Sequence, residues 1–211
     1  NKGFIMSIVT LNDRAVRSVT TFGSVTGLGN MIFIKKLTAS SSATLSFVDG
    51  ASSVVLDNTY KEYLFTFNNI HPATNNTQFQ FQGSTDSGSN YNVTMTTSFF
   101  QAQHSEAGSG TALSYKTGAD QAQGTSFQQL SADVGNENDE CFSGELRLFN
   151  PSSTTFAKHF LSRCSTYAGI DYMVDTYAAG YFNTTSAIDA AQFKMSSGNI
   201  DAGDICLYGI L

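Results

Sequence analysis

The chain has 211 residues, a formal net charge of −6 and 12% aromatic residues, but its charged fraction of 13% is only about half the usual share. Nucleic-acid binding needs a surplus of Lys and Arg, so this charge argues against it. No apolar run approaches the roughly 18–20 residues that cross a bilayer, which argues against membrane insertion. The aromatic content excludes a disordered acidic tail, and the composition is not that of a coiled coil.

The first 30 residues differ in composition from the rest. They carry Arg14 and Arg17, and then Gly23, Gly27 and Gly29 within seven positions. Closely spaced glycines interrupt regular structure. We therefore predict an N-terminal arm or docking segment over residues 1–30 and one β-domain over residues 31–211.

From residue 31 onward, short runs of alternating apolar and polar residues are separated by turn signals, which is typical of β-strands. One run places Tyr63, Phe65 and Phe67 on one face and residues 62, 64 and 66 on the other, and another ends at the turn pair Asp49-Gly50. The predicted strands cover residues 32–38, 43–48, 60–68, 78–82, 91–103, 113–117, 124–130, 141–149, 156–163, 173–182, 190–195 and 205–210.

The segments between these runs complete the predicted architecture. Residues 84–90 read as a hairpin loop, His71-Pro72 as the end of a strand, and residues 186–191 as one helical turn. Residues 67–74, 149–155 and 182–186 share an aromatic-Asn-polar pattern, which we interpret as three similar corners on one edge. Regular short strands with Gly, Asn and Ser turns predict an all-β fold, an antiparallel jelly-roll-like β-sandwich.

Two acidic clusters are the candidates for catalytic or metal chemistry. One spans residues 133–140, with Glu137, Asp139 and Glu140, and the other holds Asp201 and Asp204. A glycosidase needs two carboxylates about 5–10 Å apart. A calcium site formed by residues 136, 139 and 140 is an alternative, although the spaced pattern of a calcium loop is missing. Both clusters adjoin Gly and Asn, so we predict solvated loop acids, with no catalytic residue and no metal site.

The remaining reactive side chains show no motif. The histidines His71, His104 and His159 lack the spacing of metal ligands, and Cys141, Cys164 and Cys206 include no C-x-x-C pair. No nucleotide or nucleophile motif is present, so no cofactor is expected. The cysteines read as buried thiols of a protein that folds in a cytoplasm, and the glycosylation sequons at residues 75, 92 and 183 as chance matches.

The chain is rich in Phe, Tyr, Asn, Gln, Ser and Thr. Surfaces that bind sugars or proteins combine aromatic rings with amide groups, which gives this composition one functional interpretation. The other interpretation is a phenylalanine core with Gln, Ser and Thr on the solvent faces. The period of two between the Phe residues favours the core.

Six segments resemble a family of bacteriophage proteins that is frequent in marine phage and metagenomic sequences. They are residues 36–47 (KLTASSSATLSF), 63–74 (YLFTFNNIHPAT), 81–91 (FQGSTDSGSNY), 148–155 (LFNPSSTT), 192–200 (QFKMSSGNI) and 205–210 (ICLYGI). Members are usually treated as virion structural proteins, often tail-fibre-like. The resemblance covers about residues 31–211, and the family offers no catalytic motif.

The resemblance implies a non-enzymatic structural protein of a tailed bacteriophage virion, in a tail fibre or appendage that contacts the host surface. Its expected partners are other virion proteins, copies of itself in a homo-oligomer, above all a trimer, and a host surface glycan. It would be assembled in the host cytoplasm and reside in the virion. Two alternatives stay open: a capsid decoration protein, and a carbohydrate-active enzyme that degrades host polysaccharide.

Overall fold

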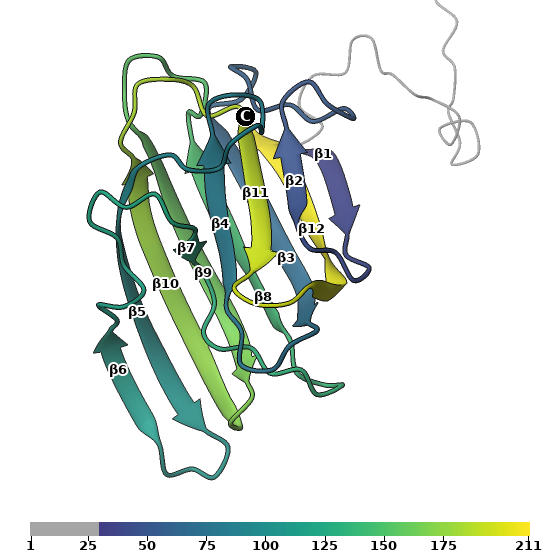
Figure 1. Cartoon of the computed structure of the whole chain (residues 1–211), viewed down its shortest axis with the longest axis vertical. Helices are drawn as coiled ribbons and strands as arrows, with labels where there is room; N and C mark the ends of the chain where they lie inside the picture. Colours follow the sequence, from purple (N-terminus) through teal and green to yellow (C-terminus); the bar gives the residue numbers. More distant parts are fainter. Residues whose placement is uncertain (1–29) are drawn as a thin grey trace, which may run out of the picture. The chain divides into compact units, whose positions relative to one another are not determined.

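The computed structural model describes residues 30–211, which form two antiparallel β-sheets packed face to face (Figure 1). The larger sheet has eight strands in the order β1-β12-β3-β8-β9-β10-β5-β6, and the smaller sheet has four in the order β2-β11-β4-β7. The larger sheet contains β1 (Met31–Thr38), β12 (Ile200–Ile210), β3 (Glu62–Pro72), β8 (Phe142–Phe149), β9 (Lys158–Ala168), β10 (Tyr172–Phe182), β5 (Met95–Ser105) and β6 (Thr111–Tyr115). The smaller contains β2 (Leu45–Val48), β11 (Ala190–Met195), β4 (Phe79–Ser84) and β7 (Gln128–Gln129).

The prediction of an all-β sandwich is therefore confirmed. Jelly-roll connectivity stays a prediction, since the sheets hold eight and four strands rather than four each. Residues 1–29 of the predicted arm lie outside the described residues. Within residues 30–211, no helix is long and apolar enough to cross a membrane.

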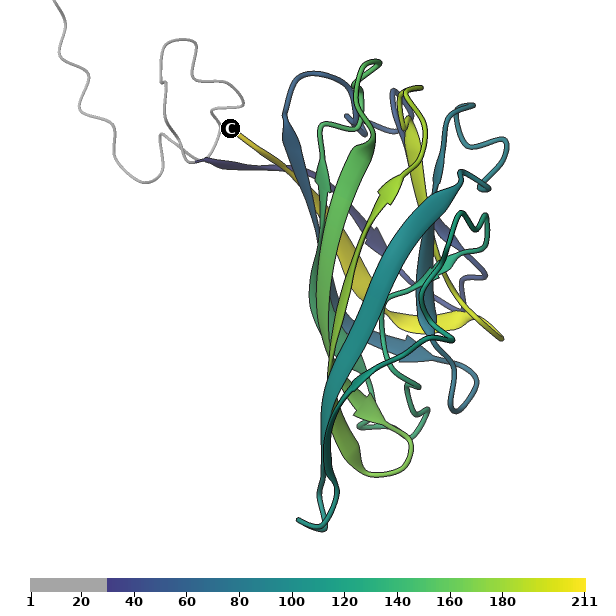
Figure 2. The ribbon, with the colours of Figure 1, turned by 90° about the vertical axis from the view of Figure 1, so that its left-hand side faces the viewer.

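Strands from the two ends of the described region interleave. The strand β12 lies between β1 and β3 in the larger sheet, and β11 lies between β2 and β4 in the smaller one. The chain thus crosses from sheet to sheet at each of its first four strands, and each of its last two strands joins two of those strands within one sheet. Figure 2 shows the two layers from the side.

Inward-facing phenylalanines fill the space between the sheets. The predicted alternation in β3 is confirmed, because Tyr63, Phe65 and Phe67 are at most 1% exposed. Phe193 of β11 lies at the centre of the core, with its ring centroid 5.2–6.2 Å from those of five other phenylalanines. These five are Phe47, Phe65, Phe67, Phe79 and Phe81.

Two predictions about connections were wrong, and one strand is longer than predicted. Residues 84–90 do not close a hairpin, because β4 and β5 belong to different sheets. The strand β3 ends at Pro72, as the His71-Pro72 pair predicted, but it runs past the predicted bound of residue 68 because a bulge at Asn69, which has a φ of 50°, returns Ile70 to the core. Residues 186–191 form no helical turn, since Ala190 already begins β11.

The three predicted corners do not share one edge. The strands β8 and β10 both run antiparallel to β9, so they end at the same end of the sheet, where the Ile188 amide donates to the Pro151 carbonyl at 2.8 Å. The strand β3 runs antiparallel to β8, which places residues 70–74 at the opposite end. The shared sequence pattern therefore reflects similar local turn chemistry and not a common location.

Asp86 organises the connection from β4 to β5. Its carboxylate accepts hydrogen bonds from the Asn90 side-chain amide at 2.7 Å, from the Asn90 backbone amide at 2.8 Å and from the Ser84 hydroxyl at 2.7 Å. These bonds, led by that of the Asn90 side chain, lower the pKa of Asp86 to about 2.

A pH dependence follows from this lowered pKa. The stability contributed by Asp86 is present above the ordinary Asp pKa of about 3.9 and is lost as the pH falls towards 2. We expect unfolding free energies, measured in urea between pH 5 and pH 2.5, to fall less steeply for Asp86→Asn than for the wild type. Asn90→Ala, which removes the leading donor, should flatten the curve in the same sense. Parallel curves for all three proteins would contradict the assignment.

Candidate functional site

A cleft of about 480 Å³ opens beside β7, where the smaller sheet ends and the larger sheet continues. The strands β5 and β6 extend past the smaller sheet, so no strand of that sheet lies over this part of the inner face of the larger sheet (Figure 1). Gln101 and Gln103 of β5 and Tyr172 of β10 lie on this uncovered inner face. The opposite wall is formed by Gln78, Gln129 and Asp133.

An apolar patch lies among these polar groups. Ala132, Ala168 and Val174 form a small buried cluster, against which Tyr172 packs. All four residues line the cleft. The site therefore combines an apolar surface with a surround of amide groups.

The amides of the cleft are partly bonded to one another. Gln101 donates from Nε2 to Gln103 Oε1 at 2.9 Å, and Gln78 donates from Nε2 to Asp133 Oδ1. Gln129 donates to the Ser131 carbonyl at 2.8 Å. Among the described residues, Gln101 Oε1, Gln103 Nε2, Gln129 Oε1 and Asp133 Oδ2 have no side-chain partner. The cleft therefore offers a ligand both hydrogen-bond acceptors and a hydrogen-bond donor.

The wall of the cleft is anchored to the larger sheet by buried polar contacts. Thr176 of β10 donates to the Leu130 carbonyl at 2.7 Å, directly after β7. Gln128, which is fully buried, accepts from the Thr97 hydroxyl at 2.7 Å and donates to the carbonyl of Ala119, a residue of the cleft, at 2.9 Å. Fixed walls lower the entropic cost of ordering the site around a ligand.

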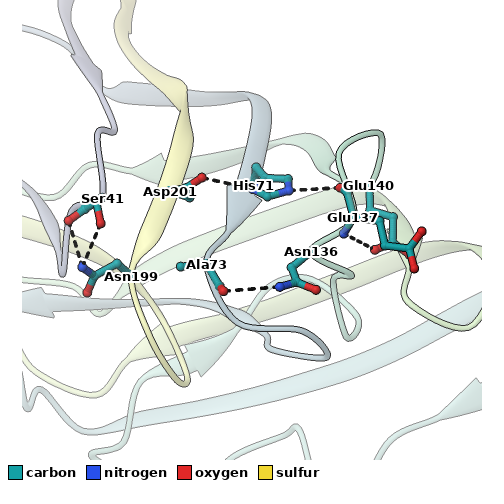
Figure 3. A network of polar contacts seen from close by, with 8 residues as sticks. All are labelled: Ser41, His71, Ala73, Asn136, Glu137, Glu140, Asn199 and Asp201. Carbon is teal, nitrogen blue, oxygen red and sulfur yellow. Dashed lines mark hydrogen bonds and ion pairs between the residues drawn. The ribbon is translucent and has the colours of Figure 1, made fainter.

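The acidic clusters lie outside this cleft, apart from Asp133. Figure 3 shows His71 between them: its Nε2 is 3.1 Å from the Glu137 carbonyl oxygen and its Nδ1 is 3.7 Å from Asp201 Oδ2. A carbonyl oxygen only accepts, so Nε2 carries the proton of this bond. Asp204 is separate and pairs with Lys36 at 3.2 Å. The structure therefore links the two clusters through a histidine rather than through facing carboxylates.

Glu140 serves to close its own loop. It is only 5% exposed, and its carboxylate accepts the Glu137 backbone amide at 2.7 Å. The carboxylate lies over Gly135, where it leaves no room for a Cβ atom. Neither Glu137 nor Glu140 lines the cleft beside β7. This geometry does not present the pair to a substrate.

The candidate metal ligands are engaged elsewhere. Asn136 donates from Nδ2 to the Ala73 carbonyl at 3.4 Å, away from the carboxylate of Glu140 (Figure 3). In the described part of the chain, no group of three or more His, Cys, Asp or Glu side chains could hold a metal ion. His104 and His159 are exposed on β5 and β9, and the three sequon asparagines are also exposed.

The three cysteines are free thiols. Cys164 is fully buried, and burial raises the pKa of its thiol to about 12. Burial also raises the pKa of Cys141, which is half-buried. A thiolate is therefore disfavoured at both positions, so neither is suited to act as a nucleophile.

The outer face of the larger sheet carries a second group of exposed side chains. One cross-strand row runs through Tyr115, Phe100, Tyr177, Arg163 and Glu145, from β6 to β8. Phe100 and Tyr177 stack with centroids 4.8 Å apart, and the Arg163 guanidinium lies 5.0 Å from the centroid of Tyr177. The face is therefore an ordered surface of aromatic and charged groups.

Ion pairs fix the charged groups of this face. Arg163 makes two bonds to Asp175, of 2.7 and 3.1 Å. Arg147 contacts Glu62 at 2.6 Å and Glu145 at 3.3 Å. The arginines are thus held in place before any partner binds.

Comparisons with known protein families, with curated proteins and with solved structures found no match to this chain.

Proposed function

We propose that this chain is a structural protein of a tailed bacteriophage virion, built into a tail fibre or appendage as a homo-oligomer. The sequence resemblance over residues 31–211 supports the virion role. The outer face of the larger sheet is the observation that carries the assembly role. We assign that face to contact with a neighbouring copy of this chain.

The outer face exposes apolar groups that a monomer in water would leave uncovered. Leu161 is 51% exposed, and Phe33, Phe100 and Tyr115 lie 39–57% exposed on the same side of the sheet. Two shallow hollows of about 460 and 320 Å³ adjoin Leu161 and can receive side chains of a partner. Extended exposed apolar surface of this kind marks interaction sites.

The charge of the face favours a second copy as the partner. Arg147 and Arg163 are paired there with Glu62, Glu145 and Asp175, so the charges largely cancel. The whole chain carries −6, which would keep copies apart elsewhere on the surface. Copies can therefore meet on this face with the least repulsion. Arg and aromatic residues are also the types enriched at interfaces.

Sedimentation analysis of the full chain tests the assembly role. We expect a homo-oligomer, a trimer in the first instance, that Leu161→Arg converts to monomer by placing an unpaired charge in the interface. Gln80→Arg, on the outer face of the smaller sheet, is the matched control and should leave the oligomer intact. A monomeric wild type, or an oligomer that survives Leu161→Arg, would overturn this interface.

Cryo-electron microscopy of the particle tests the location. Density on a tail fibre or appendage supports the proposal, whereas density over the capsid lattice would replace it by the decoration role. Absence of the chain from any particle would refute the virion role altogether. The carbohydrate-active alternative would then be examined through sugar release by the wild type, Glu137→Gln and Glu140→Gln.

A further inference from the structure

We propose that the cleft beside β7 is a binding site for a neutral saccharide. The site lies on the inner side of the larger sheet, whereas the assembly surface lies on its outer side. The inference thus goes beyond the proposed function, and it stands whether or not the chain is part of a virion. A host surface glycan would be the source of the ligand in a tail appendage.

The first argument is the pattern of polar groups. Each sugar hydroxyl both donates and accepts, and an amide side chain offers both functions in one plane. Gln101 Oε1, Gln129 Oε1 and Gln103 Nε2 provide two acceptors and one donor group within a single cleft. Asp133 adds a carboxylate oxygen, since Gln78 occupies only its Oδ1. The site can therefore satisfy several neighbouring hydroxyls.

The second argument is the apolar surface among these groups. A pyranose ring has C–H faces as well as hydroxyls, so it needs an apolar contact inside a polar rim. The cluster of Ala132, Ala168 and Val174, with Tyr172 packed against it, supplies that contact. A volume of about 480 Å³ lies within the roughly 300–1,000 Å³ of small-molecule sites.

The third argument concerns charge. Asp133 and Lys116 are the two charged residues of the lining, with opposite signs, and the remaining polar groups are amides, hydroxyls and backbone. An anion or a cation would gain little from such a lining. A purely apolar ligand would leave buried amides without hydrogen-bond partners, which is unfavourable. Gln101 is only 9% exposed, so its side chain has little contact with water even before a ligand binds.

Binding is tested with the purified full chain on an array of neutral oligosaccharides built from glucose, galactose, mannose, rhamnose and N-acetylglucosamine. The best array ligand is then titrated by calorimetry. We expect Gln103→Met and Asp133→Leu each to weaken binding at least tenfold, because each replaces a hydrogen-bonding side chain by an apolar one of similar size. The matched controls, Gln192→Met and Asp57→Leu, change the same residue types outside the cleft and should bind as the wild type does.

The assembly proposal and the saccharide proposal can be tested independently of each other. Leu161→Arg should bind the same oligosaccharide with wild-type affinity even where it abolishes assembly. Thermal unfolding of every variant shows whether a loss of binding reflects a loss of folding. Should Gln103→Met unfold, Tyr172→Ala at the rim tests the apolar contact, with the same tenfold loss expected. No binding by any oligosaccharide of the array, or wild-type affinity in the cleft variants, would overturn the proposal.

Discussion

Replacing Phe193 by alanine is expected to lower the free energy of unfolding by about 3–5 kcal/mol, the range for deleting a buried aromatic ring. Phe193 is fully buried, and its ring neighbours phenylalanines from β2, β3 and β4. The cavity would lie between two sheets that are held apart by other large rings, so the core cannot easily collapse into it. Urea denaturation followed by circular dichroism measures the loss.

Phe156→Ala is the control for this experiment. Phe156 is 68% exposed in the connection between β8 and β9, so the same chemical change should shift stability by no more than about 0.5 kcal/mol. If Phe193→Ala cost as little as Phe156→Ala, the central position of Phe193 in the core would be wrong.

The strands were largely predictable because their signal is local. Alternation in residues 60–68 correctly placed Tyr63, Phe65 and Phe67 inward, and residues 190–195 match β11 as predicted. Pairing was not predictable in the same way. The polar segment of residues 84–90 looks the same whether it joins hairpin partners or crosses between sheets, and only the distant strands β10 and β11 decide this.

Side-chain roles that depend on distant strands were also missed. Gln82 alternates with Phe81 and was expected to face solvent, but it is fully buried, and its Nε2 lies 3.0–3.1 Å from the carbonyl oxygens of Val93, Thr125 and Ser126. A short-range pattern cannot show that unpaired carbonyls of two other segments converge on this side chain. Burial of a polar group requires such partners.

The cleft had a partial signal in the sequence. Gln101 and Gln103 continue the inward alternation of Met95, Thr97 and Phe99, so two amides occupy positions that face the core. What the sequence could not show is that the smaller sheet ends at the two-residue strand β7, so that these amides line a cleft and do not face another strand. In the acidic cluster of residues 133–140, the sequence indicated solvated loop carboxylates. Glu140 is instead buried, because its carboxylate lies over Gly135 and accepts a backbone amide of its own loop.

Gln128→Leu is expected to lower the free energy of unfolding by about 2–4 kcal/mol, on the basis of about 1–3 kcal/mol for each buried group left without a partner. Gln128 accepts from Thr97 and donates to the carbonyls of Ala119 and Gln129. Leucine fills a similar volume but offers no polar atom. Urea denaturation measures the stability, and hydrogen exchange measures the opening of residues 117–127.

Two further variants separate lost hydrogen bonds from other effects. Gln123→Leu makes the same change at an exposed position and should cost clearly less than Gln128→Leu. Thr97→Val combined with Gln128→Leu removes both partners of one bond, so the double variant should lose less than the sum of the single losses. Because Ala119 and Gln129 both line the cleft, the same replacement should loosen the wall and weaken oligosaccharide binding. Additive losses with unchanged exchange would show that the buried glutamine does not hold the wall in place.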